Sequence, residues 1–426
     1  MTGFLACERF GIPDRILVPA AFLVACALIV SRRPDAVTHA QFFFEDGAWW
    51  YAQAHDMGCL RPLIIPYRDY LVVTQRLAAC VALVVPLSYA PLVMNLIGIG
   101  IEALPAAVLC SSRFAVVIPR AWLRLALGLL YVALPIMWGT MTTVTMAQWH
   151  LAVLACAVVL STPHPRPAWR AFDVLAVAAS ALSGPFAIFL VPIIAAKWYA
   201  RREPWLVTLG AIAVAGAIVQ AGVIAFGSGQ PGVRPPLGAT FPAFLRVVVE
   251  RTVYGLLVGE TGYARIFNDP ATVWLQMPTL AALGIALLAL VGYAFLRGAL
   301  ELKLFLAFAV MVLAAALVFP TTQPLQQPYW DSMTAPGAAN RYYLLLIFAL
   351  MATLVWLAAQ RSIAARAAGI AVLAFSVVFG VAPNWREPPP LDYDFARFVR
   401  KYERVPSGTR VQIPYPPGWG MVLTKP

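Results

Sequence analysis

The sequence predicts an all-α polytopic membrane protein with about 11–13 transmembrane helices. Of the 426 residues, 61% are hydrophobic and only 12% are charged, and the mean hydropathy is +0.78. A soluble domain is typically about half apolar and about a quarter charged. The apolar residues also form runs approaching the roughly 20 residues that cross a bilayer. This composition excludes both an ordinary water-soluble enzyme and a disordered chain.

Each apolar run is expected to form one helix. The short runs could be half-helices packed inside the protein, which leaves the helix count open. The segment Ser183-Gly184-Pro185 separates two of them. In chain order the runs cover residues 16–30, 71–86, 92–110, 122–135, 151–160, 174–182, 186–196, 206–226, 280–296, 304–319, 342–359 and 370–381.

The segments between the runs define the predicted domain organisation. Residues 1–383 form a transmembrane domain with outer loops at 32–69, 227–273 and 320–340, and residues 384–426 form a C-terminal outer-face tail. In the first loop, residues 47–57 are expected to form a short helix on the membrane surface, with Trp49, Trp50 and Tyr51 at headgroup level.

The tail has two parts of different character. Phe395, Phe398, Val399 and Tyr402 recur at helical spacing, which predicts a short amphipathic helix. The string at residues 413–419 contains three prolines, so we expect it to be non-helical.

The basic loops predict the orientation in the membrane. Short cytoplasmic loops carry an excess of Lys and Arg. This rule places Arg361–Arg366, Arg297–Lys303, Lys197–Arg202 and the arginines of residues 113–124 and 166–170 inside, and the tail outside. Counting back with 71–86 and 92–110 as full spans puts residues 32–69 inside as well. The functional interpretation below needs this loop outside, so either a short segment is miscounted or one basic loop breaks the rule.

Cysteine, histidine and charge patterns exclude several kinds of site. The six cysteines include no CxxC pair, and the four histidines show no metal-ligand spacing, so neither a zinc site nor a disulfide framework is indicated. The net charge is +12, but the basic residues are scattered singly between apolar runs. We therefore expect no nucleic-acid partner.

The most informative motif is Phe42-Phe43-Phe44-Glu45-Asp46-Gly47, which follows the first apolar run. A carboxylate there could take a proton from a nucleophilic hydroxyl as a general base. It could instead hold a divalent cation. We predict that Asp46 is the catalytic base and that Glu45 supports it. The alternative is a solvated helix start without chemistry.

The order of these features resembles the C superfamily of integral-membrane glycosyltransferases (GT-C). Members have a first transmembrane helix, a long outer loop with an acidic motif, many further helices and a C-terminal outer segment. Other strings resemble multi-pass proteins of bacterial surface-glycan assembly. They are Phe44-Glu45-Asp46-Gly47, Pro66-Tyr67-Arg68-Asp69-Tyr70 with Arg76, Leu182-Ser183-Gly184-Pro185-Phe186, Asn340-Arg341-Tyr342-Tyr343 and Pro416-Pro417-Gly418-Trp419. This chain departs from larger members because it has no sizeable soluble C-terminal domain.

The resemblance implies a GT-C-like fold and an enzyme of the bacterial inner (plasma) membrane. Such an enzyme, of the inverting type, would transfer a hexosyl or pentosyl group from a polyprenyl-phosphate-linked sugar. The acceptor would be a hydroxyl of a glycan or lipid on the outer face. The superfamily's catalytic or metal-site acid would fall on Asp46 or Glu45. A requirement for Mg²⁺ or Mn²⁺ stays open.

A lipid-phosphate donor would need arginines at the outer interface, because the planar guanidinium binds phosphate with two hydrogen bonds. Arg68, Arg76, Arg251 and Arg341 are the candidates. Arg341 could equally be a snorkelling anchor. Arg76 lies within a predicted span and could form a structural pair with Glu102.

Sugar binding favours aromatic platforms and hydrogen-bonding side chains. The candidates are Tyr67, Tyr70, Trp149, His150, Trp330 and Asp331. The alternative for the aromatic residues is the interfacial belt common in membrane proteins.

Two other functions are compatible with the sequence. A transporter or flippase of lipid-linked sugars would also need many helices and intramembrane charges, but it is expected to show an internal repeat, and none is visible. A glycan polymerase shares outer loops with arginines but needs no acid in the first loop.

Overall fold

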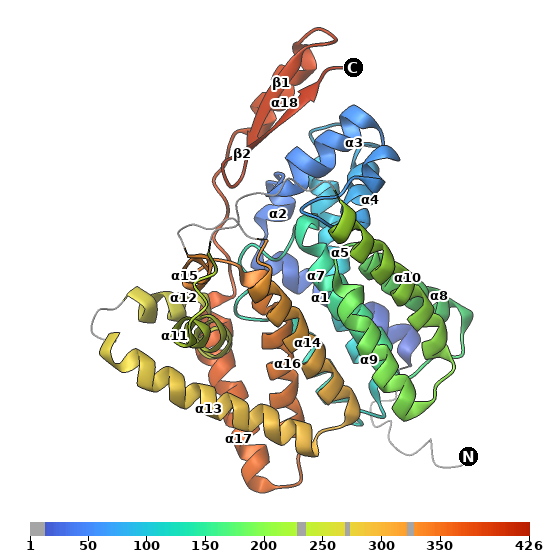
Figure 1. Ribbon diagram of the computed structural model, residues 1–426. Helices are drawn as coiled ribbons and strands as arrows, with labels where there is room; N and C mark the ends of the chain where they lie inside the picture. The colour runs from blue at the N-terminus through green and yellow to red at the C-terminus, as the bar shows by residue number, and fades with distance from the viewer. Residues whose placement is uncertain (1–12, 228–235, 269–272, 322–327) are drawn as a thin grey trace.

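The described chain is built mostly from helices packed against one another (Figure 1). The computed structural model describes residues 13–227, 236–268, 273–321 and 328–426. Residues 1–12 lie outside the described residues. The same is true of parts of the predicted loops at 227–273 and 320–340. The expectation of an all-α polytopic membrane protein is confirmed for the described part of the chain.

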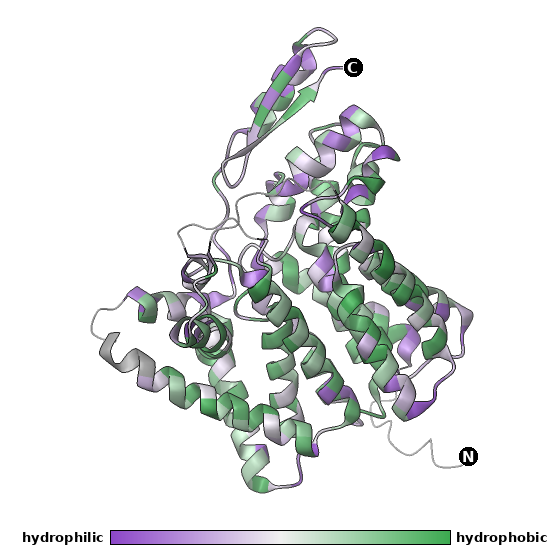
Figure 2. Ribbon diagram, in the orientation of Figure 1, coloured by the Kyte–Doolittle hydropathy of each residue, from purple (hydrophilic) through white to green (hydrophobic). Residues whose placement is uncertain are grey.

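Seven described helices are long and apolar enough to cross a membrane, fewer than the 11–13 predicted. Figure 2 shows hydrophobic residues along the helix bodies and hydrophilic residues mainly near the ends and in the tail. The seven are α1 (Asp14–Arg32), α5 (Ala90–Cys110), α10 (Trp205–Phe226), α13 (Val273–Arg297), α14 (Leu300–Val318), α16 (Asn340–Ala358) and α17 (Ile363–Phe375), which continues helically to Asn384.

Four shorter helices run beside these seven. They are α6 (Ala121–Val132), α7 (Ala147–Leu160), α8 (Pro167–Ala181) and α9 (Phe186–Arg201). All residues of α7 are buried, and it packs against α5 and α8. A helix surrounded by protein in this way needs no full bilayer length, because its neighbours satisfy the polar groups at its ends.

Polar contacts join the helix ends at the basic end of the bundle. The Arg113 guanidinium binds both carboxylate oxygens of Asp173 at 2.7 and 2.8 Å. Lys197 donates to the carbonyl groups of the last turn of α7. Arg201 pairs with Glu301 at 2.8 Å. These contacts bring together the loops that the positive-inside rule assigns to the cytoplasm.

Helix α4 (Val73–Ala82) resolves the topological conflict, because it is not a span. Its ten residues measure about 15 Å, half the thickness of the hydrocarbon layer. The Val73 N–H donates to the Leu182 carbonyl at the end of α8, so α4 begins at the end of the bundle opposite the basic loops. The chain then turns directly into α5, and residues 32–72 share this end with the tail. We call it the outer end, because the positive-inside rule assigns the opposite, basic end to the cytoplasm.

The tail forms a small unit on the outer end. Helix α18 (Phe395–Arg404) confirms the predicted amphipathic helix, with Phe395, Val399 and Tyr402 buried. Strands β1 (Arg410–Tyr415) and β2 (Trp419–Thr424) then form an antiparallel hairpin that the all-α prediction missed. Alternate residues of β1 are buried, so a two-residue period was present in the sequence.

The first outer loop is largely helical. It contains α2 (Asp35–Thr38), a turn of π-helix η1 (Asp46–Tyr51), α3 (Ala52–Met57) and a 3₁₀ turn η2 (Arg61–Ile64). The expected helix over residues 47–57 is confirmed. Its placement was wrong in part: Trp49 is 41% exposed, but Trp50 and Tyr51 are buried in protein and do not lie at headgroup level.

The other two predicted loops also contain helices. Residues 241–268 form α11 (Phe241–Leu245), the π-helical η5 (Arg246–Tyr254) and α12 (Gly255–Asn268). The third loop contains α15 (Tyr329–Thr334). The η5 and α15 segments pack against each other, which brings these two loops together at the outer end.

We predict opposite labelling of two engineered cysteines in a cysteine-free background. Leu60, which is 81% exposed, lies in the first loop, and the exposed Arg166 lies at the basic end. In intact cells, a membrane-impermeant maleimide should label Leu60→Cys, whereas Arg166→Cys should require permeabilised cells. The reverse pattern would contradict the assigned orientation.

Candidate functional site

The Asp46 carboxylate is buried at the start of η1, with no exposed surface. Its Oδ1 accepts hydrogen bonds from the Thr145 N–H at 2.9 Å and the Thr145 hydroxyl at 2.8 Å. Its Oδ2 accepts from the Thr143 hydroxyl at 2.8 Å. An unpaired buried carboxylate is costly, so these three donors stabilise the contact between the first loop and the segment before α7.

A second buried carboxylate holds the same segment. Glu102, midway along α5, accepts a hydrogen bond from the Thr142 N–H at 3.0 Å. The indole N–H of Trp50 donates to the Thr145 hydroxyl at 2.9 Å. The segment at residues 142–145 is therefore held from both the first loop and α5.

The tail fixes the backbone on either side of Asp46. The Tyr415 hydroxyl donates to the Phe44 carbonyl at 2.9 Å and accepts from the Ala48 N–H at 2.7 Å. Gly47 allows this approach, since an added Cβ would lie 2.8 Å from the Tyr415 ring. We call this contact the Tyr415 clamp.

Burial raises the pKa of Asp46 to about 7, and the hydrogen bonds from Thr143 and Thr145 oppose this shift. The carboxylate thus titrates near neutral pH but has no exposed surface through which to meet a substrate. A metal ion does not fit here either, because three hydrogen-bond donors already point at the two oxygens. Within the described ranges, no three His, Cys, Asp or Glu residues gather where they could hold a metal.

Glu45 is partly exposed, unlike its neighbour. Its Oε1 accepts a hydrogen bond from the Tyr67 hydroxyl at 2.8 Å, and the Arg68 Nε donates to the same hydroxyl at 3.2 Å. Arg68 also donates to the Thr321 carbonyl. The structure thus brings the predicted residues Glu45, Tyr67 and Arg68 into one hydrogen-bonded row, which we call the Glu45 row.

Tyr70, Gln148 and Arg341 lie close to this row. The Gln148 amide donates to the Tyr70 hydroxyl at 3.4 Å. Burial raises the pKa of Tyr70, while the Gln148 hydrogen bond and the nearby charge of Arg341 lower it. Arg341 lies in the first turn of α16, over the Tyr342 ring. The Tyr342 hydroxyl in turn accepts from the Thr321 N–H at 2.8 Å, which ties α16 to the residue that Arg68 binds.

Several backbone positions around these residues have unusual conformations. Phe44, Arg68, Asp69 and Thr142 have φ values of 48°, 47°, 71° and 61°. Residues other than glycine rarely adopt positive φ, and such strain gathers at functional sites. This strain and the π-helical turn at Asp46 both point to function at the outer end.

Two predicted phosphate ligands have structural partners instead. Arg76 is buried and donates to the Trp49 and Ile65 carbonyls, and its guanidinium lies 4.9 Å from the centre of the Trp50 ring. The alternative pairing of Arg76 with Glu102 is wrong, because Glu102 binds Thr142.

Arg251 is fully buried in η5. Its guanidinium lies 3.5 Å from Glu260, donates to the Ala338 carbonyl at 3.2 Å and packs on the Tyr263 ring. Its burial leaves it no surface for a substrate phosphate.

Four predicted sugar ligands do not join the Glu45 row. His150 is fully buried between the Tyr131 hydroxyl and the Thr140 carbonyl. Trp149 packs on Phe186 and Tyr342. Trp330 donates to the Leu317 carbonyl at 3.0 Å.

Asp331 lies in α15, and its side chain makes no hydrogen bond or ion pair with any residue that the structure describes. No contact among the described residues connects it with Glu45.

Sequence reasoning missed the residues that hold the motif in place. Thr143, Thr145 and Tyr415 are ordinary polar residues in the sequence, and each finds its partner about 100 or more residues away. The only available signal was that the run Thr142-Thr143-Val144-Thr145 interrupts an apolar stretch.

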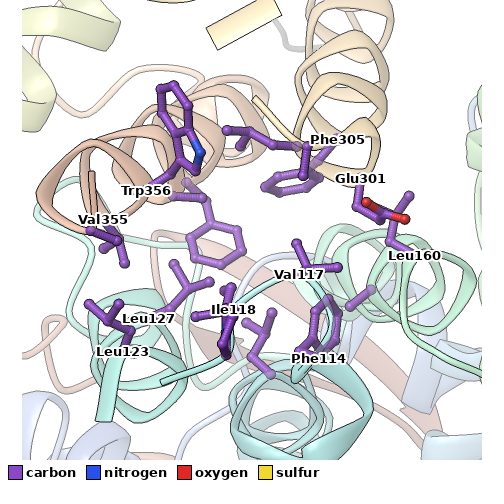
Figure 3. Close-up of a pocket in the computed structure, with 18 of the residues that line it drawn as sticks. Phe114, Val117, Ile118, Leu123, Leu127, Leu160, Glu301, Phe305, Val355 and Trp356 are labelled. Atoms are coloured by element: carbon purple, nitrogen blue, oxygen red, sulfur yellow. The ribbon is translucent and has the colours of Figure 1, made fainter. Parts of the chain in front are cut away.

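An apolar cavity of about 110 Å³ lies at the basic end, between α6, α7, α14 and α16 (Figure 3). Phe114, Leu127, Phe305 and Trp356 line it, together with Glu301, which pairs with Arg201. This cavity lies at the opposite end of the bundle from the Glu45 row and presents almost no polar group for sugar chemistry.

No protein-family model, curated protein or solved structure matches the chain. The resemblance to GT-C enzymes therefore stays a prediction.

We predict that Gly47→Ala destabilises the protein by about 1–3 kcal/mol, as overpacking of a buried contact does. The added methyl group must displace the Tyr415 ring and weaken the clamp. The measurement is thermal unfolding in detergent. Gly222→Ala in α10 is the control, since no atom lies within 4 Å of its added Cβ. Equal unfolding temperatures for the two variants would contradict the clamp.

We also predict a pH-dependent difference between the wild type and Asp46→Asn. The folded-state pKa of about 7 lies above the ordinary value of 3.8, so the folded protein binds this proton more tightly. The wild type should therefore lose stability relative to the variant as pH rises from about 4 to about 7, by up to about 4 kcal/mol. Asp394→Asn, at an exposed carboxylate, should show no such trend. A relative gain in stability with rising pH would contradict a pKa dominated by burial.

Proposed function

We propose that this protein is a membrane glycosyltransferase of GT-C type. It would move a sugar from a polyprenyl-phosphate donor to an acceptor hydroxyl at the outer end of the bundle. The observation that carries the proposal is the Glu45 row: a partly exposed carboxylate, held by Tyr67 next to Arg68, at the end of an apolar helical bundle.

The proposal exchanges the roles expected for the two acids. Glu45 takes the acceptor proton, because it is partly exposed and Tyr67 orients its carboxylate. Asp46 positions Glu45, since it is buried and accepts three hydrogen bonds. Adjacent residues on a helix point about 100° apart, which explains how one acid faces inward and the other outward.

Arg68 and Arg341 are the proposed phosphate ligands among the four predicted arginines. Both are partly exposed at the outer end, whereas Arg76 and Arg251 are buried among structural partners. A guanidinium stabilises the negative charge that develops on a leaving phosphate. Tyr70 and Gln148 supply hydroxyl and amide groups for the sugar.

The proposed reaction is a single displacement at the anomeric carbon of the donor sugar. The acceptor hydroxyl gives its proton to Glu45 as its oxygen forms a bond to the anomeric carbon. The bond from that carbon to the phosphate oxygen breaks, and polyprenyl phosphate leaves with the electron pair. Attack from the face opposite the phosphate inverts the anomeric centre.

We predict that Glu45→Gln lowers sugar transfer by about 10²–10⁴-fold, the usual contribution of a general base. Cells lacking the wild-type gene and carrying this variant should make a surface glycan that is one sugar lighter by mass spectrometry. The polyprenyl-phosphate-linked sugar should accumulate.

Glu403→Gln, at an exposed position of α18, is the matched control and should restore the glycan. An unchanged glycan in Glu45→Gln cells would overturn the proposal. A lipid-linked sugar trapped on the cytoplasmic leaflet would favour a flippase, and altered chain length without loss of a sugar would favour a polymerase.

A further inference from the structure

A second cavity, of about 660 Å³, opens at the outer end. Its walls come from the end of α1, from α12, from the chain after α17 and from the loop before α16. It holds none of the residues of the Glu45 row. The lining includes Trp138, Glu260, Arg265, Gly337, Arg386 and Glu387.

The charges around this cavity do not cancel. Glu387 lies 3.5 Å from Arg33, and Glu260 lies 3.5 Å from Arg251, so each glutamate already has a cationic neighbour. Arg265 and Arg386 are both exposed, and neither forms an ion pair with the parts of the chain that the structure describes. Two exposed arginines without an ion-pair partner among the described residues therefore line the cavity, a suitable arrangement for a phosphate group.

Two glutamates of the lining carry carboxylate oxygens without well-aligned hydrogen-bond donors. Glu387 is 8% exposed and lies beside Arg32 and Arg33, but neither of its carboxylate oxygens accepts a well-aligned hydrogen bond among the described residues. The same holds for one oxygen of Glu260. Buried acceptors normally have donors, so these oxygens point to a ligand that carries hydroxyl groups.

An aromatic ring completes the cavity. Trp138 lines it and is 41% exposed, and Gly337 packs closely against its ring, since an added Cβ would lie 3.0 Å from it. Gly337 has a φ of 77°, a conformation that favours glycine. An indole face of this kind packs well against a sugar or polyol.

We propose that this cavity binds a phosphate ester that carries free hydroxyl groups. Arg265 and Arg386 hold the phosphate, Glu260 and Glu387 accept hydrogen bonds from the hydroxyls, and Trp138 packs against the carbon skeleton. A phosphosugar and the headgroup of phosphatidylglycerol share this chemistry. The site goes beyond the proposed transferase reaction, which places its donor phosphate at Arg68 and Arg341.

The test measures binding to the purified full chain in phosphatidylcholine nanodiscs. One arm titrates soluble glucose 1-phosphate, with inorganic phosphate as the comparison. The other arm adds phosphatidylglycerol to the nanodisc and counts bound lipids by native mass spectrometry. We expect the hydroxyl-bearing probes to bind more tightly than inorganic phosphate, and Trp138→Leu to remove that preference.

Two arginine variants and one control decide the outcome. Arg265→Gln and Arg386→Gln should each weaken binding at least about tenfold, because each removes a charge-assisted bidentate contact. Arg400→Gln, at an exposed position of α18, should change nothing. Thermal unfolding checks that all variants are folded.

Binding in either arm that follows this pattern supports the site, and the arm in which it occurs identifies the source of the phosphate ester. Absence of binding in both arms, or an equal loss in Arg400→Gln, would overturn the proposal. Because the readout is binding and not sugar transfer, this result is independent of Glu45→Gln.

Discussion

The fold at the outer end depends on the burial of two carboxylates against one short segment. Asp46 and Glu102 together bind residues 142–145, and both lie fully inside the protein. A buried carboxylate without donors is so costly that the first loop, α5 and the start of α7 must meet here. The Tyr415 clamp then locks the tail onto the same loop. Glu45 is thus positioned by segments from across the chain.

Two arginines at the outer end are buried inside the protein, unlike the arginines that typically lie at a membrane interface. Arg76 and Arg251 do not anchor helices in headgroups, because each is buried and bound by carbonyls and aromatic rings. Each such arginine stabilises a segment that is not a full span. Irregular backbone at this depth is tolerated where protein, and not lipid, surrounds it. The outer end can therefore carry polar chemistry on an otherwise apolar bundle.

Composition and periodicity were sufficient to predict the helices but not their contacts. Every predicted apolar run contains a helix, and the spacing of Phe395, Val399 and Tyr402 correctly placed α18. Residues 71–86 were wrongly counted as a transmembrane helix, because hydropathy cannot distinguish a helix that spans the membrane from a short helix enclosed by protein. The acidic motif lies where the first loop, α5 and the segment before α7 meet. The partners of Asp46 could not be predicted, since they depend on contacts between residues distant in the sequence.

The most direct test of this account is to locate the sugar headgroup by cryo-electron microscopy. The chain would be studied in nanodiscs that retain the lipid-linked sugars of its own membrane. The account predicts headgroup density at the outer end, with a sugar or acceptor oxygen about 3 Å from the Glu45 carboxylate. Headgroup density at the basic end, or on the outer end but out of reach of Glu45, would contradict it.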